Sequence, residues 1–302
     1  MDKKSLLFLL NPKSGKGQIK NKLLEIIDVF VKCGYEVCVR PTQKAKEVQA
    51  LLTDISGYDL VVISGGDGTL NEAISGMMFH ENRVPIGYIP AGSTNDFAAS
   101  LRIPKDMVRA ARIAATGEDF CCDVGRFNQE YFAYVAAFGL FTEISYETPQ
   151  EWKNILGYMA YLLGGMKSLQ SMQSYAMRIE TEERIIEGDF IFGMVTNSIS
   201  IGGFKSLTNQ EVSLDDGFFE VTLIRTPKNP VELSGLLAGM TKLVGDAEVL
   251  YSFKARQITF TCTQLVAWTL DGEFGGEHGE AVIQNERRAL PLRVGRRKGD
   301  RR

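Results

Sequence analysis

The stretch Val61-Val62-Ile63-Ser64-Gly65-Gly66-Asp67-Gly68-Thr69-Leu70-Asn71-Glu72 places three glycines in four positions directly after a run of strand-forming residues. A helix-like pattern follows from Asn71. Glycine lets backbone N–H groups approach a polyanion closely, and a helix N-terminus adds a favourable dipole. The stretch therefore predicts a strand, a phosphate-binding turn and the start of a helix. An ordinary tight turn between a strand and a helix is the alternative.

The residues around this stretch alternate between strand and helix patterns as far as position 125. We expect strands at 5–10, 35–40, 59–64 and 84–89, and helices at 20–33, 45–54 and 71–78. This order predicts an α/β N-terminal domain whose parallel sheet is covered by helices on both faces. Ligands of such sheets bind at the carboxyl ends of the strands.

The pattern changes from about Asp123 onward, where short strand-like runs dominate. We expect strands at 131–138, 175–180, 185–196, 217–225, 257–263 and 265–270, and helices at 152–169 and 230–243. Many strands with few helices predict a β-rich, sandwich-like C-terminal domain of antiparallel strands. The expected domains are 1–124 and 125–289, and residues 290–302 are expected to pack back on the first domain.

The composition is typical of a globular protein without nucleic-acid partners. The 302 residues carry a net charge of -3, so no global field attracts them to nucleic acid. No apolar run approaches the roughly 20 residues of a membrane helix, and the five cysteines lack metal-ligand spacing. These features favour a cytoplasmic protein. The basic segment 293–302 is interpreted as a solvated terminus, with contact to anionic lipid as the alternative.

Three glycine-containing turns follow expected strands of the first domain, at 11–16, 65–69 and 90–96. In a parallel sheet all three lie at one edge, where they supply backbone donors, hydroxyls, two lysines and the carboxylates of Asp67 and Asp96. Triphosphate requires donors and cations, and magnesium requires hard oxygen ligands. The turns match neither the GxxxxGK[ST] nor the GxGxxG spacing. They therefore predict a site for ATP and Mg²⁺ that differs from both common nucleotide-binding motifs.

With these motifs in place, the chain resembles the bacterial soluble diacylglycerol kinases, which belong to a wider lipid-kinase group. The matching pieces are 11–16, 65–72, 90–96, 145–149, 214–217 and 271–276, so the resemblance covers nearly the whole length. The glycine-aspartate-glycine turn is shared with NAD kinases and phosphofructokinases, which implies a related N-terminal fold. The Pro90–Asp96 turn and Asp271-Gly272-Glu273 are what select the lipid kinases.

The resemblance implies a set of ATP contacts, with Ser93 in place of the usual threonine. The set is Asn11, Pro12, Lys13, Ser14, Gly15, Thr42, Gly66, Asp67, Gly68, Thr69, Leu70, Asn71, Glu72 and Ser93. The resemblance also implies an acidic network of Asp67, Asp96 and Asp123 near the magnesium that ATP carries.

Two further acidic segments have alternative interpretations. Asp271-Gly272-Glu273 is consistent with a surface hairpin turn that bears solvated acids; the resemblance implies that Glu273 is the catalytic base and Asp271 a supporting acid. Asp215-Asp216 is consistent with a simple β-turn. There the resemblance implies a structural magnesium ion bound by the Asp216 carboxylate and by the carbonyls of Ser213 and Phe218.

The segment that would contact the lipid has several interpretations. The expected helix at 152–169 is apolar nearly all round, which is consistent with a core helix, a wall for acyl chains, or a surface that enters the bilayer.

The resemblance implies an ATP- and magnesium-dependent kinase that converts 1,2-diacylglycerol to phosphatidic acid. Its substrate would be met at the inner face of the membrane by reversible peripheral contact. Dimers are common among similar kinases, so a homodimer is one assembly that the resemblance allows. The alternatives are phosphoryl transfer to another lipid alcohol, an NAD kinase-like activity, or nucleotide binding without catalysis.

Overall fold

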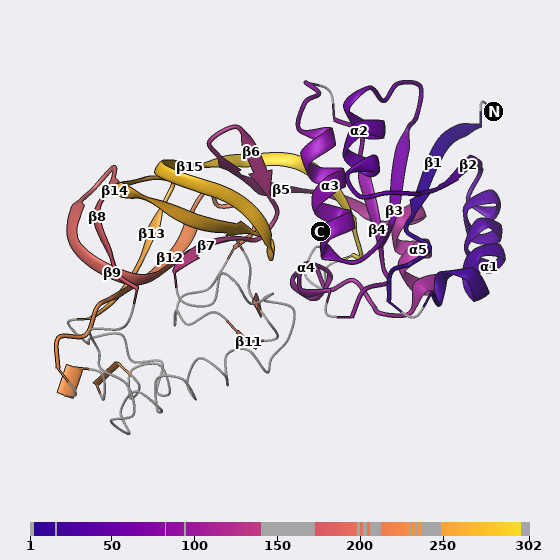
Figure 1. Cartoon of the computed structure of the whole chain (residues 1–302). Coiled ribbons are helices and arrows are strands. Elements are labelled where there is room, and N and C mark those ends of the chain that lie inside the picture. The colour runs from indigo at the N-terminus through magenta and orange to yellow at the C-terminus, as the bar shows by residue number, and fades with distance from the viewer. Residues whose placement is uncertain are drawn as a thin grey trace. The chain divides into compact units, whose positions relative to one another are not determined.

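The computed structural model describes residues 3–15, 17–81, 83–93, 95–139, 173–197, 200–201, 204–205, 213–229, 231–232, 235–236 and 249–296. The chain divides into two compact units. The first comprises Met1–Val124 together with Arg288–Arg302, and the second comprises Gly125–Arg287 (Figure 1). Every helix in the described residues is too short or too polar to cross a membrane.

The first unit is built on parallel strands. They are β1 (Lys4–Leu10), β2 (Tyr35–Pro41), β3 (Leu60–Gly65) and β4 (Ile86–Pro90), in the order β4-β3-β1-β2. The end of β15 (Glu273–Val294) adds a parallel partner to β4 through Leu292 and Ile86. All six residues of β3 are buried, which explains its unbroken run of apolar and small residues.

Five helices of the described residues accompany this sheet. They are α1 (Ile19–Lys32), α2 (Glu47–Thr53), α3 (Asp67–Met77), α4 (Asp96–Ser100) and α5 (Met107–Thr116). α1 packs with α5, and α2 packs with α3. α3 begins at Asp67, four residues before the expected start, because Gly66 is its extended N-cap and the helix therefore begins inside the glycine turn. The short α4 and the alanine-rich α5 were not expected from the sequence.

The second unit is β-rich and antiparallel. Its strands are β6 (Glu130–Phe132), β7 (Val135–Gly139), β8 (Tyr175–Thr181), β9 (Ile185–Thr196), β12 (Phe219–Arg225), β13 (Leu250–Ala255), β14 (Gln257–Leu270), the end of β5 (Glu118–Phe127) and most of β15. β10 (Ser200–Ile201) and β11 (Phe204–Lys205) form a separate pair. β8 and β7 each pair with both β9 and β14, at opposite halves of these two long strands. The strands thus close around an interior.

Aromatic side chains fill that interior. The ring centroid of Trp268 lies 5.0 Å from that of Phe127, 4.9 Å from that of Phe138 and 5.0 Å from that of Phe260. The four residues belong to a single hydrophobic cluster that β5, β7 and β14 contribute to. Alternating burial along β8 shows the inward and outward faces expected for such strands.

Several expected elements differ from the structure. The run expected at 131–138 is divided into β6 and β7, and the runs at 257–263 and 265–270 form the single strand β14, whose register shifts between Thr261 and Val266. β5, β13 and β15 were not expected. The expected helix at 152–169 and the motif at 145–149 lie outside the described residues, as does most of 230–243.

Candidate active site

The turns after β1, β3 and β4 come together at the carboxyl edge of the first unit's sheet. The Asn11 N–H donates to the Ser64 carbonyl at 2.8 Å, and the Ala91 N–H donates to the Gly65 carbonyl at 2.8 Å. After β2, the Thr42 N–H donates to the Leu10 carbonyl at 2.9 Å. The structure therefore brings together the three turns that the sequence singles out.

Two glycines allow this close approach. A Cβ on Gly15 would lie 2.3 Å from the Ala91 carbonyl oxygen, and one on Gly92 would lie 2.7 Å from the Cα of Gly66. Gly15 also has a φ of 54°, a conformation that favours glycine. Any larger residue at either position would push two of the turns apart.

Asn95 and Tyr88 order the turn after β4. Asn95 has a φ of 57°; its Oδ1 accepts from the Gly92 N–H at 2.9 Å, and its Nδ2 donates to the Gly92 carbonyl at 2.7 Å. The Tyr88 hydroxyl lies 3.3 Å from Asn95 Oδ1 and 3.2 Å from the Gly65 carbonyl. Tyr88 was missed from the sequence, because it looks like an ordinary strand residue.

Asp67 and Asp96 form the acidic centre of this edge. The Asp67 Oδ2 accepts from the Asp96 N–H at 3.1 Å, while its Oδ1 is buried and finds no hydrogen-bond partner among the described residues. The pKa of Asp67 is raised to about 6, chiefly by burial and also by the nearby Asp96 charge, although N–H groups at the start of α4 oppose the shift. An enclosed carboxylate oxygen beside a second carboxylate fits a hard cation such as Mg²⁺.

Asp123, the third member of the expected acidic network, has a clear structural contact. It is fully buried, and its Oδ1 accepts from the Arg288 N–H at 2.7 Å. Asp123 therefore holds the chain where it returns to the first unit. Its participation near magnesium stays a prediction.

The residues expected to contact ATP differ in their burial and in whether protein groups already bind their side chains. Asn11 forms a local turn with the Lys13 N–H at 3.0 Å, and its Nδ2 lies 3.4 Å from Thr69 Oγ1. Leu70 is buried in the core, and the Glu72 carboxylate accepts from the backbone N–H groups that begin α2, at 2.8 and 3.1 Å. Pro12, Ser14, Gly66, Gly68 and Asn71 are half-buried, and Ser93 is exposed. Lys16 and Thr94 lie outside the described residues.

Comparison with known proteins identifies the family. A model of the diacylglycerol kinase catalytic domain matches residues 5–127. The chain is 33% identical over 282 residues to a diacylglycerol kinase of Staphylococcus carnosus, covering 91% of this chain and 90% of that protein. It is also 33% identical to a diacylglycerol kinase of Bacillus subtilis, covering 89% of each. The chain belongs to the diacylglycerol kinase family.

Solved structures support the same fold for this family member. The crystal structure of a diacylglycerol kinase from Bacillus anthracis strain Sterne matches 98% of both chains, with a TM-score of 0.75 and 19% identity. Yeast NADH kinase complexed with NADH matches 99% of this chain and 85% of its own, with a TM-score of 0.53 and 10% identity. The fold is thus the two-domain architecture that diacylglycerol kinases and NAD kinase-like proteins share.

In the second unit of this diacylglycerol kinase family member, Asp271 has an anchoring position. Asp271 and Gly272 form the two-residue turn between β14 and β15, with φ values of 51° and 86°. The Asp271 carboxylate is buried and accepts from the N–H groups of Ala133, Tyr134 and Val135 at 2.6, 3.0 and 2.9 Å. The hairpin expected from the sequence is present, but this acid is not solvated. It fixes the turn between β6 and β7.

Glu273 is the first residue of β15 and is exposed. It pairs across the hairpin with Leu270. Its side chain is therefore available to a ligand, in contrast to that of Asp271.

Asp216, expected at a structural magnesium site, is bound by protein groups. Its Oδ1 accepts from the Phe218 N–H at 3.0 Å, and its Oδ2 lies 3.0 Å from Lys254 Nζ. The same ammonium lies 3.3 Å from the buried Glu220, whose pKa is raised to about 7, chiefly by burial, although Lys254 opposes the shift. Ser213 donates from its hydroxyl to Asp215 at 2.8 Å.

No cluster of three or more His, Cys, Asp or Glu suited to a metal occurs in the described part of the chain. Binding of a divalent ion at Asp216 would require Lys254 to move aside, and the structural magnesium site at Asp216, Ser213 and Phe218 stays a prediction.

Proposed function

We propose that this chain transfers the γ-phosphoryl group of ATP to the primary hydroxyl of 1,2-diacylglycerol and produces phosphatidic acid. The observation that carries the proposal is 33% identity over 91% of the chain to a protein named diacylglycerol kinase. The glycine-rich edge with its paired carboxylates and the exposed Glu273 supply the groups that this chemistry requires.

The first unit would bind ATP. Backbone N–H groups at the start of α3 and the helix dipole favour the phosphates. Asp67 and Asp96 would hold Mg²⁺, which when bound supplies positive charge to the phosphate oxygens. The ATP contacts expected from the sequence, from Asn11 to Ser93, are part of this proposal, except that Leu70 and Glu72 contribute through packing and through capping α2.

Glu273 would act as general base in the second unit. The lipid oxygen attacks the γ-phosphorus, the bond from this phosphorus to the ADP oxygen breaks, and Glu273 takes the hydroxyl proton. Asp271 supports this step indirectly, because its three backbone hydrogen bonds fix the hairpin that presents Glu273. It is a positioning residue.

The lipid substrate implies where the protein works. Diacylglycerol resides in the membrane, so we propose a cytoplasmic protein that binds reversibly to the inner membrane face. Self-association as a homodimer stays a prediction.

The test uses purified protein, labelled ATP, magnesium, and mixed micelles that carry diacylglycerol, ceramide, sphingosine or undecaprenol. We expect phosphatidic acid from diacylglycerol alone, and we expect Glu273→Gln to fold normally and lose turnover by at least about 100-fold. A different phosphorylated lipid would change the substrate assignment. Near-normal turnover by Glu273→Gln would refute the assignment of the base.

NAD is the second candidate acceptor. The fold-level match to yeast NADH kinase favours including it. NAD is therefore supplied as acceptor in a separate reaction, and formation of NADP without phosphatidic acid would replace the lipid-kinase proposal.

A further inference from the structure

One surface of the first unit, which we call the α5 basic face, consists of Lys105, Arg109, Arg112 and Arg296. α5 contains no acidic residue; its buried side consists of Met107 and four alanines. Arg109 and Arg112 lie at exposed positions of α5, and Lys105 is exposed just before the Asp106 N-cap. The alanine side fixes the helix to the unit, and the arginines are left for solvent or a partner.

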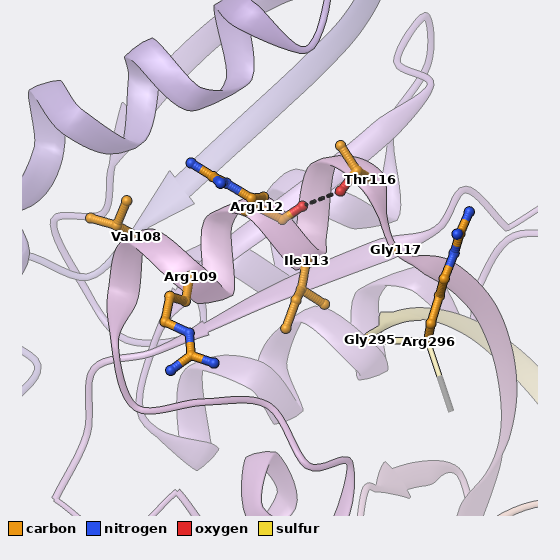
Figure 2. Close-up of a pocket in the computed structure, with 8 residues that line it drawn as sticks. All are labelled: Val108, Arg109, Arg112, Ile113, Thr116, Gly117, Gly295 and Arg296. Atoms are coloured by element: carbon orange, nitrogen blue, oxygen red, sulfur yellow. Dashed lines mark hydrogen bonds between the residues drawn. The ribbon is translucent and has the colours of Figure 1, made fainter. Parts of the chain in front are cut away.

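A pocket of about 590 Å³ lies along this face (Figure 2). It is lined by Val108, Arg109, Arg112, Ile113, Thr116, Gly117, Gly295 and Arg296. The lining thus contains three guanidinium groups and no carboxylate. Arg109 and Arg112 leave α5 in different directions, and Arg296 comes from the segment after β15 (Figure 2). Guanidiniums spread in this way suit several separate negative groups better than one small anion.

The two helix arginines are not neutralised within the described part of the chain. Their guanidinium groups make no ion pair or hydrogen bond there, whereas Arg293 pairs with Asp119 at 3.1 Å and Arg296 pairs with Glu118 at 3.2 Å. The nearest acid in sequence, Asp106, is used as the N-cap of α5 and accepts from the Arg109 backbone N–H at 2.7 Å.

The positive charge is local. The chain as a whole carries a net charge of -3, so the positive charge of the α5 basic face differs in sign from that of the whole protein. A basic helix face on an acidic protein favours one side of the molecule for contact with an anionic surface.

We propose that the α5 basic face binds the phosphate groups of anionic lipid headgroups and holds the protein at the membrane surface. The inference rests on the proposed function, since a membrane-resident substrate requires such a contact. The guanidinium groups of Arg109 and Arg112 can each bind a phosphate through paired donors, whereas that of Arg296 is already paired with Glu118. Val108 and Ile113, which are half-buried beside the arginines, provide apolar contact at headgroup depth.

The experiment measures binding of the full chain to sedimented vesicles of phosphatidylcholine, with and without phosphatidylglycerol. We expect salt-sensitive binding that depends on phosphatidylglycerol. The double variant Arg109→Gln/Arg112→Gln should bind roughly 25-fold more weakly, at about fivefold for each surface charge removed. Arg178→Gln/Arg184→Gln is the matched control, because it removes two half-exposed charges from the second unit. It should bind nearly as the unaltered chain does.

Three results would overturn the inference: no binding to anionic vesicles, equal loss in both double variants, or unchanged binding by Arg109→Gln/Arg112→Gln. Calorimetry with inorganic phosphate tests whether the pocket binds a soluble anion in place of lipid headgroups. Phosphate binding that the α5 double variant abolishes, without an effect on vesicles, would assign the pocket to a soluble anion instead.

Failure of the proposed function gives a different result. Turnover of a water-soluble short-chain diacylglycerol tests catalysis alone, and the α5 double variant should retain it. Glu273→Gln should bind vesicles like the unaltered chain even though it is inactive.

Discussion

At the scale of single residues, the buried carboxylate of Asp67 is unfavourable in its ionised form. Its Oδ1 is enclosed without a described partner, and burial raises its pKa to about 6. Because the folded pKa lies above the unfolded value, the folded state binds more protons between about pH 4 and 6. The stability therefore falls as the pH rises through this window. Above about pH 6, Asp67 is ionised in both the folded and the unfolded protein, and its full destabilising effect is present.

The first prediction concerns Asp67→Asn. At neutral pH and without magnesium, this variant should be more stable than the unaltered chain by about 2 to 3 kcal/mol, since it removes the enclosed charge. Urea unfolding at pH 4 and pH 7.5 measures the difference, which should nearly vanish at the lower pH. Added magnesium should stabilise the unaltered chain and leave the variant unchanged. Equal stability at both pH values would contradict this account.

Asp271 shows the opposite situation, in which a buried carboxylate is satisfied by three backbone donors. Asp271→Ala should destabilise the protein by about 2 to 4 kcal/mol, because it leaves buried N–H groups without an acceptor. Glu280→Ala, an exposed acid on β15, is the control and should change stability by less than about 0.5 kcal/mol. Urea unfolding of both variants tests the contrast. A similar small effect in both would show that the three hydrogen bonds do not anchor the hairpin.

At the scale of elements, the close packing of the turns after β1 and β4 depends on Gly15. Gly15→Ala should weaken nucleotide binding by about tenfold or more, because its Cβ would meet the Ala91 carbonyl at 2.3 Å. Gly57→Ala is a matched control with a φ of 77° and nothing within 4 Å of the added Cβ. Both variants carry similar backbone strain. Titration with a fluorescent ATP analogue separates them, and equal affinities would show that the turn contact is dispensable.

The apolar patterns of individual strands and helices explain which parts of the fold could be predicted from the sequence. β1, β3 and β9 have continuous or alternating apolar patterns, so their expected bounds fall within one residue of the structure. α5 was missed although its buried alanines and exposed arginines alternate at helical spacing, so this pattern could have identified the helix. β15 was missed because glycines and charged residues interrupt 22 residues whose strand character comes from pairing with β14.

The candidate site, like the fold, has some features that the sequence predicts and others that it does not. The convergence of three turns follows from strand order, since the carboxyl ends of parallel strands share an edge. Three other features depend on residues far apart in sequence: Asp271 with the β6–β7 turn, Lys254 with Asp216, and Asp123 with Arg288. Spacing within a motif contains no information about such partners. For this reason, the acids could be named from the sequence but their partners could not.

The pairing of β12 with β13 gives the next prediction at this scale. Glu220 and Lys254 lie directly opposite each other, and the Lys254 ammonium also contacts Asp216. Lys254→Met should destabilise the second unit by about 3 kcal/mol, because it leaves a buried carboxylate without its counter-charge. Urea unfolding measures this change, and Lys228→Met, an exposed lysine after β12, is the control. Unchanged stability would mean that another group, or a bound metal, compensates these acids.

At the scale of the whole molecule, the second unit is an insertion into the first. It occupies Gly125–Arg287, and the chain on either side is joined where Asp123 Oδ1 accepts from the Arg288 N–H at 2.7 Å. The end of β15 then pairs with β4 and completes the first unit's sheet. The exit and re-entry points therefore lie side by side within one compact body, as expected for a domain that folds around its own core.

The last prediction follows from this connection. Replacement of residues 125–287 by a short glycine-serine linker should leave a first unit that folds and binds ATP with magnesium but phosphorylates no lipid. A linker of about four residues spans the gap easily, since an extended residue covers roughly 3.5 Å. Circular dichroism and calorimetry with ATP measure folding and binding. In the shortened chain, Asp123→Ala should lower the melting temperature, because it removes the contact that joins the two ends. A shortened chain that folds but no longer binds ATP would show that the nucleotide site needs residues of the second unit.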